Sequence, residues 1–160
     1  MAGIRRREVL VGAAALAAAC RGLASPAAAQ SASQAAAAEA AKAETLRALF
    51  GDRVPVPGNV QLKIPVIAEN GGSVQVAVAA DPAPGGAMAR RIVLIAPGNP
   101  HALVAEIRFG PRAARAEAVI RLRLGRSQTV LAVAELPDGS LRSASADITV
   151  TLGACAESFE

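Results

Sequence analysis

The chain has 160 residues, a formal net charge of +4 and a sequence pI near 10.0. This length accommodates one ordinary domain of roughly 100–150 residues together with a targeting segment or tail. An apolar fraction of 52% excludes a compositionally disordered chain, and an aromatic fraction of 2% argues against a protein that stacks nucleic-acid bases. Two cysteines and one histidine are too few for a four-ligand Cys/His zinc site or a disulfide framework.

The N-terminal segment has the pattern of an export signal. Arg5–Arg7 precede an apolar stretch of about a dozen residues, which is shorter than the roughly 20 residues that span a bilayer. Ala27–Ala29 then supply small residues of the A-x-A cleavage type, and the order Arg6-Arg7-Glu8-Val9-Leu10 fits the twin-arginine class. We therefore predict a twin-arginine signal over residues 1–29 and a periplasmic mature protein without membrane attachment.

Cleavage after Ala29 changes both the charge and the cysteine count. It removes four arginines and one glutamate, so the mature chain carries a formal net charge of only +1. The basic pI therefore implies no nucleic-acid partner. Cleavage also removes Cys20. A lipidation motif would have leucine three residues before this cysteine, but Ala17 stands there, so we expect Cys20 to be discarded with the signal and not lipidated.

Residues 30–58 are predicted to form a helical leader and a linker. The segment Gln34–Phe50 is rich in Ala, Glu, Lys and Leu, which favour a helix. Its last apolar residues, Leu46, Leu49 and Phe50, fall on one face. A glycine and two prolines follow directly, so the helix is expected to end at Phe50.

Residues 59–152 alternate apolar and polar side chains with a period of two, which is typical of half-buried strands. Turn signals between the strands include Asn70-Gly71, for which we predict a positive φ, and Pro137–Ser140, for which we predict a tight hairpin. Because such signals recur about every ten residues, the pattern indicates an all-β fold, an antiparallel β-sandwich of about seven strands with a short N-terminal helix. The predicted strands cover residues 60–64, 73–78, 91–96, 103–109, 115–124, 129–136 and 141–152.

Few side chains of this sandwich suggest catalysis. Glu117 and Glu135 are carboxylates that nothing in the sequence places in one cleft, and we expect both to be solvated. His101 follows a proline-rich loop and has no Cys or Asp at metal-ligand spacing, so it is expected to be a polar loop residue. We predict neither a catalytic set, a cofactor nor a metal. Arginines also form a basic stripe, which consists of Arg121, Arg123 and Arg126. This stripe is either the outward face of a strand or a docking surface for an acidic partner.

Cys155 stands three residues beyond Leu152, the predicted end of the last strand. The segment 153–160 is small and polar, so we predict a mobile tail that leaves this thiol exposed. An exposed thiol in an oxidising compartment forms mixed disulfides or is oxidised. The unpaired cysteine therefore either has no function or has a function that depends on its thiol.

Four segments of the chain resemble, in order, the SoxY family, the sulfur-carrying subunits of the periplasmic thiosulfate-oxidising system. They are Lys63–Gly71 (KIPVIAENG), Ala96–Pro100 (APGNP), Thr129–Gly139 (TVLAVAELPDG) and Ile148–Cys155 (ITVTLGAC). Each segment alone is a weak signal, but the four occur in the family's order. The resemblance runs from about Lys42 to Cys155 and implies that the sandwich predicted over residues 59–152 is immunoglobulin-like.

The resemblance also implies a function. Cys155 matches the carrier cysteine, to which a haem-containing enzyme conjugates thiosulfate and from which a hydrolase releases sulfate. The flanking residues Gly153, Ala154 and Ala156 would form a swinging arm. A SoxZ-like subunit would be the heterodimer partner, and the chain would be a carrier rather than an enzyme.

The tail departs from the family pattern, which ends close to Gly-Gly-Cys-Gly-Gly. Here alanines flank Cys155, and five further residues follow it, among them Glu157 and Phe159. Alanine narrows the backbone freedom that glycine allows. An alternative function is therefore a divergent periplasmic binding module that keeps the sandwich but carries no thiosulfate.

Overall fold

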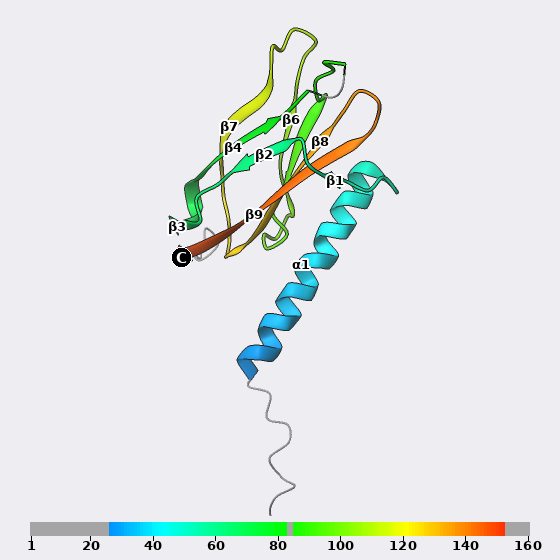
Figure 1. Cartoon of the computed structure of the whole chain (residues 1–160). Helices are drawn as coiled ribbons and strands as arrows, with labels where there is room; N and C mark the ends of the chain where they lie inside the picture. Colours follow the sequence, from blue (N-terminus) through cyan, green and yellow to red (C-terminus); the bar gives the residue numbers. More distant parts are fainter. Residues whose placement is uncertain (1–25, 83–84, 153–160) are drawn as a thin grey trace, which may run out of the picture. The chain divides into compact units, whose positions relative to one another are not determined.

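The computed structural model describes residues 26–82 and 85–152 of the chain (Figure 1). The chain divides into two compact units, residues 1–33 and residues 34–160, and every strand of the described part belongs to the second unit. Most of the predicted signal, residues 1–25, lies outside the described residues. In the described part, no helix combines the length and apolar character needed to span a bilayer.

Helix α1 spans Pro26–Phe50 and therefore begins earlier than the predicted Gln34. Proline suits the first helical position, because its φ is already helical and its missing N–H would have no intrahelical partner there. The helix ends where the sequence predicted. Gly51 has a φ of 65°, and its N–H donates to the Arg47 carbonyl at 2.9 Å, which closes the last turn.

Nine strand segments in the described residues form two sheets. The larger sheet has the order β1-β9-β8-β5-β6, with β3 also paired to β9, and the smaller sheet has the order β2-β4-β7. The predicted all-β, immunoglobulin-like sandwich with an N-terminal helix is confirmed. The strands are β1 (Val56–Pro57), β2 (Val60–Lys63), β3 (Ile67–Asn70), β4 (Val74–Ala80), β5 (Arg91–Ile95), β6 (Leu103–Arg108), β7 (Ala116–Leu122), β8 (Gln128–Glu135) and β9 (Leu141–Leu152).

Two short strands, β1 and β3, were not predicted, and both pair with β9 in parallel. Strand β1 has only two residues, and β3 is exposed at three of its four positions, so neither shows a period of two. The prediction for Asn70-Gly71 was wrong in detail: Asn70 has an extended φ of −127° and caps a short 3₁₀ helix, η1 (Gly71–Ser73), by accepting a hydrogen bond from the Gly72 N–H at 2.7 Å. The hairpin at Pro137–Ser140 is confirmed by a φ of 83° at Gly139.

The main core lies between the two sheets, where β4 contributes Val74, Val76 and Val78 from one face. Strand β5 is buried on both faces, since Ile92 and Leu94 contact this core while Val93 and Ile95 face the other way. The last turn of α1 covers that outer face of the larger sheet with Phe50, which is 3% exposed. The helix end thus closes a second, smaller core.

Candidate functional site: the end of strand β9

Strand β9 is the element that leads to the predicted carrier cysteine. It ends at Leu152, as the sequence predicted, three residues before Cys155. In Figure 1 it runs to the C-terminal end of the described chain beside β3. Cys155 and the predicted arm residues Gly153, Ala154 and Ala156 lie outside the described residues. The structure therefore describes the base of the tail.

Strand β3 holds one side of this base. It pairs in parallel with the last part of β9, up to Asn70 opposite Leu152. The backbone N–H of Thr149 donates to the Val66 carbonyl at 2.8 Å, just before β3 begins. The hydroxyl of Thr151 donates to the Glu69 carbonyl at 2.8 Å, so a side chain reinforces the pairing where the strand ends.

A single serine holds the opposite side. Pairing of β8 with β9 ends at Gln128 opposite Ile148, so β8 offers no backbone partner to the final residues of β9. The Ser127 hydroxyl accepts a hydrogen bond from the Val150 N–H at 2.9 Å and lies 3.4 Å from the Val150 carbonyl, to which it donates. The side chain of Ser127 thereby continues the ladder beyond the end of β8.

The loop that contains Ser127 is fixed to the segment Ala96–Pro100 through Asn99. The Asn99 side-chain amide donates to the Arg123 carbonyl at 2.7 Å. Its oxygen accepts from the Gly125 N–H at 2.9 Å and from the Gln128 side chain at 3.0 Å. One asparagine thus joins the start and the end of the connection between β7 and β8.

Gly98 brings the same two loops into close contact. Its N–H donates to the Gln128 side-chain oxygen at 2.7 Å, and its carbonyl accepts from the Arg126 Nε at 2.7 Å. A β-carbon at Gly98 would lie 2.9 Å from the Gln128 oxygen and 3.1 Å from the Arg126 Cγ. This position therefore favours glycine because of close approach rather than a positive φ.

Three of the four segments that resemble the family meet at this end of the sandwich. The segment 63–71 contains β3, the segment 96–100 supplies Asn99, and the segment from residue 148 contains the end of β9. Sequence reasoning missed the roles of Ser127 and Thr151. The signal was weak, because exposed serine and threonine side chains at strand ends are common.

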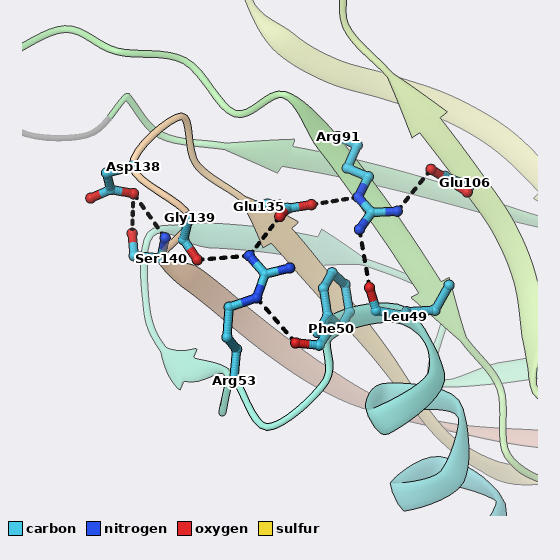
Figure 2. A network of polar contacts seen from close by, with 9 residues as sticks. All are labelled: Leu49, Phe50, Arg53, Arg91, Glu106, Glu135, Asp138, Gly139 and Ser140. Carbon is cyan, nitrogen blue, oxygen red and sulfur yellow. Dashed lines mark hydrogen bonds and ion pairs between the residues drawn. The ribbon is translucent and has the colours of Figure 1, made fainter.

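The fourth segment forms β8 and the hairpin, where Glu135 enters an ion-pair network (Figure 2). Glu135 accepts from Arg53 Nη1 and from Arg91 Nε, both at 2.6 Å. Arg91 also donates to the Leu49 carbonyl at 3.3 Å, and Arg53 Nε donates to the Phe50 carbonyl at 3.1 Å. Both arginines therefore satisfy carbonyls at the α1 C-terminus, where cations are favoured.

The expectation that Glu135 is solvated is thus wrong, since its side chain is 17% exposed and doubly paired. Burial opposes its ionisation, but the hydrogen bonds from Arg53 and Arg91 outweigh burial and lower the pKa of Glu135 below its ordinary value. Glu117 lies on β7, is exposed and has Arg115 as an ion-pair partner at 3.9 Å. The two carboxylates do not form an acid–base pair.

The other predicted candidates are surface residues. His101 is exposed, as expected for a loop residue. Arg121, Arg123 and Arg126 are all exposed, but Arg126 Nε is engaged with the Gly98 carbonyl and Arg121 lies 3.4 Å from the Ser73 hydroxyl. Whether this stripe binds an acidic partner stays a prediction. Residues 26–82 and 85–152 contain no group of three His, Cys, Asp or Glu side chains arranged to hold a metal.

Comparisons with known proteins place these observations in a family. The family model described as sulfur oxidation protein SoxY matches residues 46–155. The structure of the sulfur carrier protein SoxY from Chlorobium limicola f thiosulfatophilum is 28% identical, with a TM-score of 0.64 over 74% of this chain and 98% of that protein. No curated protein sequence matches the chain.

Superoxide reductase (neelaredoxin) from Ignicoccus hospitalis shares the fold alone. It is 22% identical, with a TM-score of 0.50 over 58% of this chain and 80% of that protein. The same sandwich therefore occurs in proteins of different function, and the function of this chain has to be argued from its own residues and from the matched family.

Proposed function

The chain belongs to the SoxY family of sulfur oxidation proteins, and on this premise we propose that it carries thiosulfate-derived sulfur intermediates covalently on Cys155. One observation carries the proposal. The family match extends past the last strand and ends at residue 155, so it includes the cysteine and the residues that connect it to β9. The SoxY relative from Chlorobium limicola f thiosulfatophilum, 98% of which the match covers, is described as a sulfur carrier protein.

The proposed chemistry uses the thiol as a handle. A haem-containing partner enzyme removes two electrons and one proton while a bond forms between the Cys155 sulfur and the terminal sulfur of thiosulfate. The product is a cysteine S-thiosulfonate. A hydrolase then adds water, which cleaves the sulfur–sulfur bond to the sulfonate group, releases sulfate and two protons, and leaves the persulfide anion on Cys155. The chain holds the intermediate while its partners perform both steps, so we propose a carrier rather than an enzyme.

We also propose a SoxZ-like subunit as a heterodimer partner. The sandwich leaves strand edges that a second protein could cover: β6 ends one side of the larger sheet, and β2 and β7 end the smaller sheet. Exposed edges of this kind are covered or otherwise protected in natural β-proteins. The predicted export signal makes the periplasm the proposed compartment.

A second candidate is a divergent binding module that keeps the sandwich and the partner interface but carries no thiosulfate. The departure of the tail from Gly-Gly-Cys-Gly-Gly favours it. The two candidates differ in what the tail can do. Replacing Ala154, Ala156 and Glu157 by glycine should leave thiosulfate oxidation nearly unchanged if the chain is already a carrier, whereas activity that appears only after this replacement would support the module.

Growth on thiosulfate tests the carrier proposal in cells. A strain that produces only Cys155→Ser should lose thiosulfate oxidation, while a strain with Ser145→Ala, an exposed change on the same strand β9, should keep it. Protein levels are compared in both strains. Normal thiosulfate oxidation with Cys155→Ser at wild-type protein level would refute the proposal.

A further inference from the structure

We propose that Ser127 and Thr151 are positioning residues that fix the pivot of the carrier arm, residues 153–160, at Leu152. The inference rests on the proposed function and deepens it, because it concerns how far the cysteine can travel. It is argued from the hydrogen bonds on the two sides of β9, all of which lie within the described residues.

Without these side chains, the hydrogen-bond ladder on the β8 side of β9 would end at Ile148. The antiparallel partner β8 stops at Gln128, opposite Ile148. From there to Leu152, the backbone partners of β9 in the described residues are Val66 and β3, which is four residues long. A strand that is paired on one side by so short an element lies at the low end of local stability and frays readily.

The Ser127 hydroxyl supplies a bond that is missing on the β8 side of β9, and the Thr151 hydroxyl adds a bond on the β3 side. Ser127 accepts from the Val150 N–H at 2.9 Å, in the place where β8 would have continued. Thr151 donates to the Glu69 carbonyl at 2.8 Å and lies 3.4 Å from the Ala68 carbonyl. The bonds lie on opposite sides of the strand and one residue apart, so together they hold the end of β9 from both edges.

The two segments that these hydroxyls join to β9, the Ser127 loop and β3, are themselves fixed by hydrogen bonds to the rest of the sandwich. The loop of Ser127 is joined to Asn99 through hydrogen bonds at Gly125 and Gln128. The far end of β3 continues into η1, whose Gly71 carbonyl accepts from the Leu124 N–H at 2.8 Å. The partners of both hydroxyls therefore belong to the framework of the sandwich.

A fixed pivot limits the reach of the cysteine. Cys155 lies three positions beyond Leu152, and three extended residues span at most about 10 Å. If β9 frayed back to Ile148, the cysteine would lie seven positions beyond the pivot. Effective concentration at a docked active site falls roughly as the −3/2 power of linker length, so it would fall about three- to fourfold.

A spin label on Cys155 tests the pivot directly. The full-length chain with Cys20→Ser carries one cysteine, to which a nitroxide is attached. We expect the double variant Ser127→Ala/Thr151→Val to show narrower, more mobile spectral lines than the parent. Thr149→Val is the matched control, since Thr149 lies on the same strand and its hydroxyl makes no hydrogen bond in the described part; Thr151→Ser keeps the hydroxyl, and both should match the parent.

Equal spectra for the double variant and the parent would overturn the inference. Hydrogen exchange of the unsubstituted protein decides the question if the double variant fails to fold: amides of Val150 and Thr151 should be protected nearly as well as that of Ile148, and exchange at the rate of an unstructured chain would contradict the pivot. In the double variant, the rate constant for thiosulfate conjugation by the haem-containing enzyme should fall about three- to fourfold. Because label mobility needs no sulfur chemistry, a failure of the carrier proposal would not be mistaken for a failure of the pivot.

Discussion

At the residue scale, Glu135 illustrates how one carboxylate stabilises a junction between elements. It lies at the end of β8 and accepts from Arg53, in the linker after α1, and from Arg91 at the start of β5 (Figure 2). Arg91 also pairs with Glu106 at 3.1 Å, and its guanidinium lies 5.1 Å from the centroid of the Phe50 ring. The network thus links the helix end to three strands.

We predict that Glu135→Gln lowers the free energy of unfolding by about 1–2 kcal/mol at pH 7, because it removes a charged acceptor from two arginines. The pKa of Glu135 is lowered in the folded protein, so its stabilisation is complete above its ordinary value of 4.5 and is lost as the pH falls through the folded pKa. The difference between variant and parent should therefore shrink in acid. Urea unfolding at pH 7 and near pH 3 measures it.

Glu117→Gln provides the matched control for this change. Glu117 is exposed and its ion pair with Arg115 is long, so the same substitution there should alter stability by less than about 0.5 kcal/mol. A Glu135→Gln effect no larger than the Glu117→Gln effect, or one that grows in acid, would contradict the role assigned to the network.

Gly98 gives a second prediction at this scale. A β-carbon there would press on the Gln128 and Arg126 side chains, both of which are engaged in hydrogen bonds with Gly98 itself. We expect Gly98→Ala to destabilise the protein by about 1–2 kcal/mol. Gly110→Ala is the control, since nothing lies within 4 Å of a β-carbon at Gly110. Equal melting temperatures for the two variants would show that the loops absorb the added methyl.

At the element scale, the sandwich is asymmetric in how its outer faces are covered. The end of α1 packs Leu46, Leu49 and Phe50 on the outer face of the larger sheet, where Val93 and Ile95 are fully buried. This explains why β5 is apolar at every position from Ile92 to Ile95 rather than alternating. The sequence predicts a strand here, and the residues at its outward positions, Val93 and Ile95, are apolar because the helix covers them.

We predict that Phe50→Ala destabilises the protein by about 3 kcal/mol, because it empties the centre of the smaller core. Val54→Ala, four residues further on, should change stability by less than about 0.5 kcal/mol, since Val54 is 78% exposed. Urea unfolding of both variants checks the prediction. An effect of Phe50→Ala below 1 kcal/mol would mean that α1 contributes little to the sandwich.

The elements also show what sequence patterns could and could not predict. Most of the longer strands were predicted because their alternation persists over five or more residues, as in Val74–Ala80. Strand β3 was missed because Ile67–Asn70 is exposed at three of its four positions and thus lacks an alternating pattern. Its pairing with β9 joins segments about 80 residues apart, and no local pattern encodes such a contact.

At the scale of the whole molecule, the two ends of the sandwich differ in what their residues do. One end carries the hairpin, Glu135 and the helix junction, which stabilise the fold. The other gathers β3, the Asn99 loop and the end of β9, from which the tail departs. The candidate cysteine was found from sequence alone, because an unpaired thiol after the last strand is visible there. The roles of the Ser127 and Thr151 hydroxyls could not be predicted from the sequence, because their hydrogen-bond partners are distant in the chain.

The central claim is that Cys155 carries a sulfur intermediate, and intact mass spectrometry tests it most directly. Protein purified without reductant from cells grown on thiosulfate should show an added mass that corresponds to a thiosulfonate or persulfide. Reduction should remove that mass, and peptide mapping should place it on Cys155. Unmodified Cys155 in such cells, while they actively oxidise thiosulfate, would contradict the account.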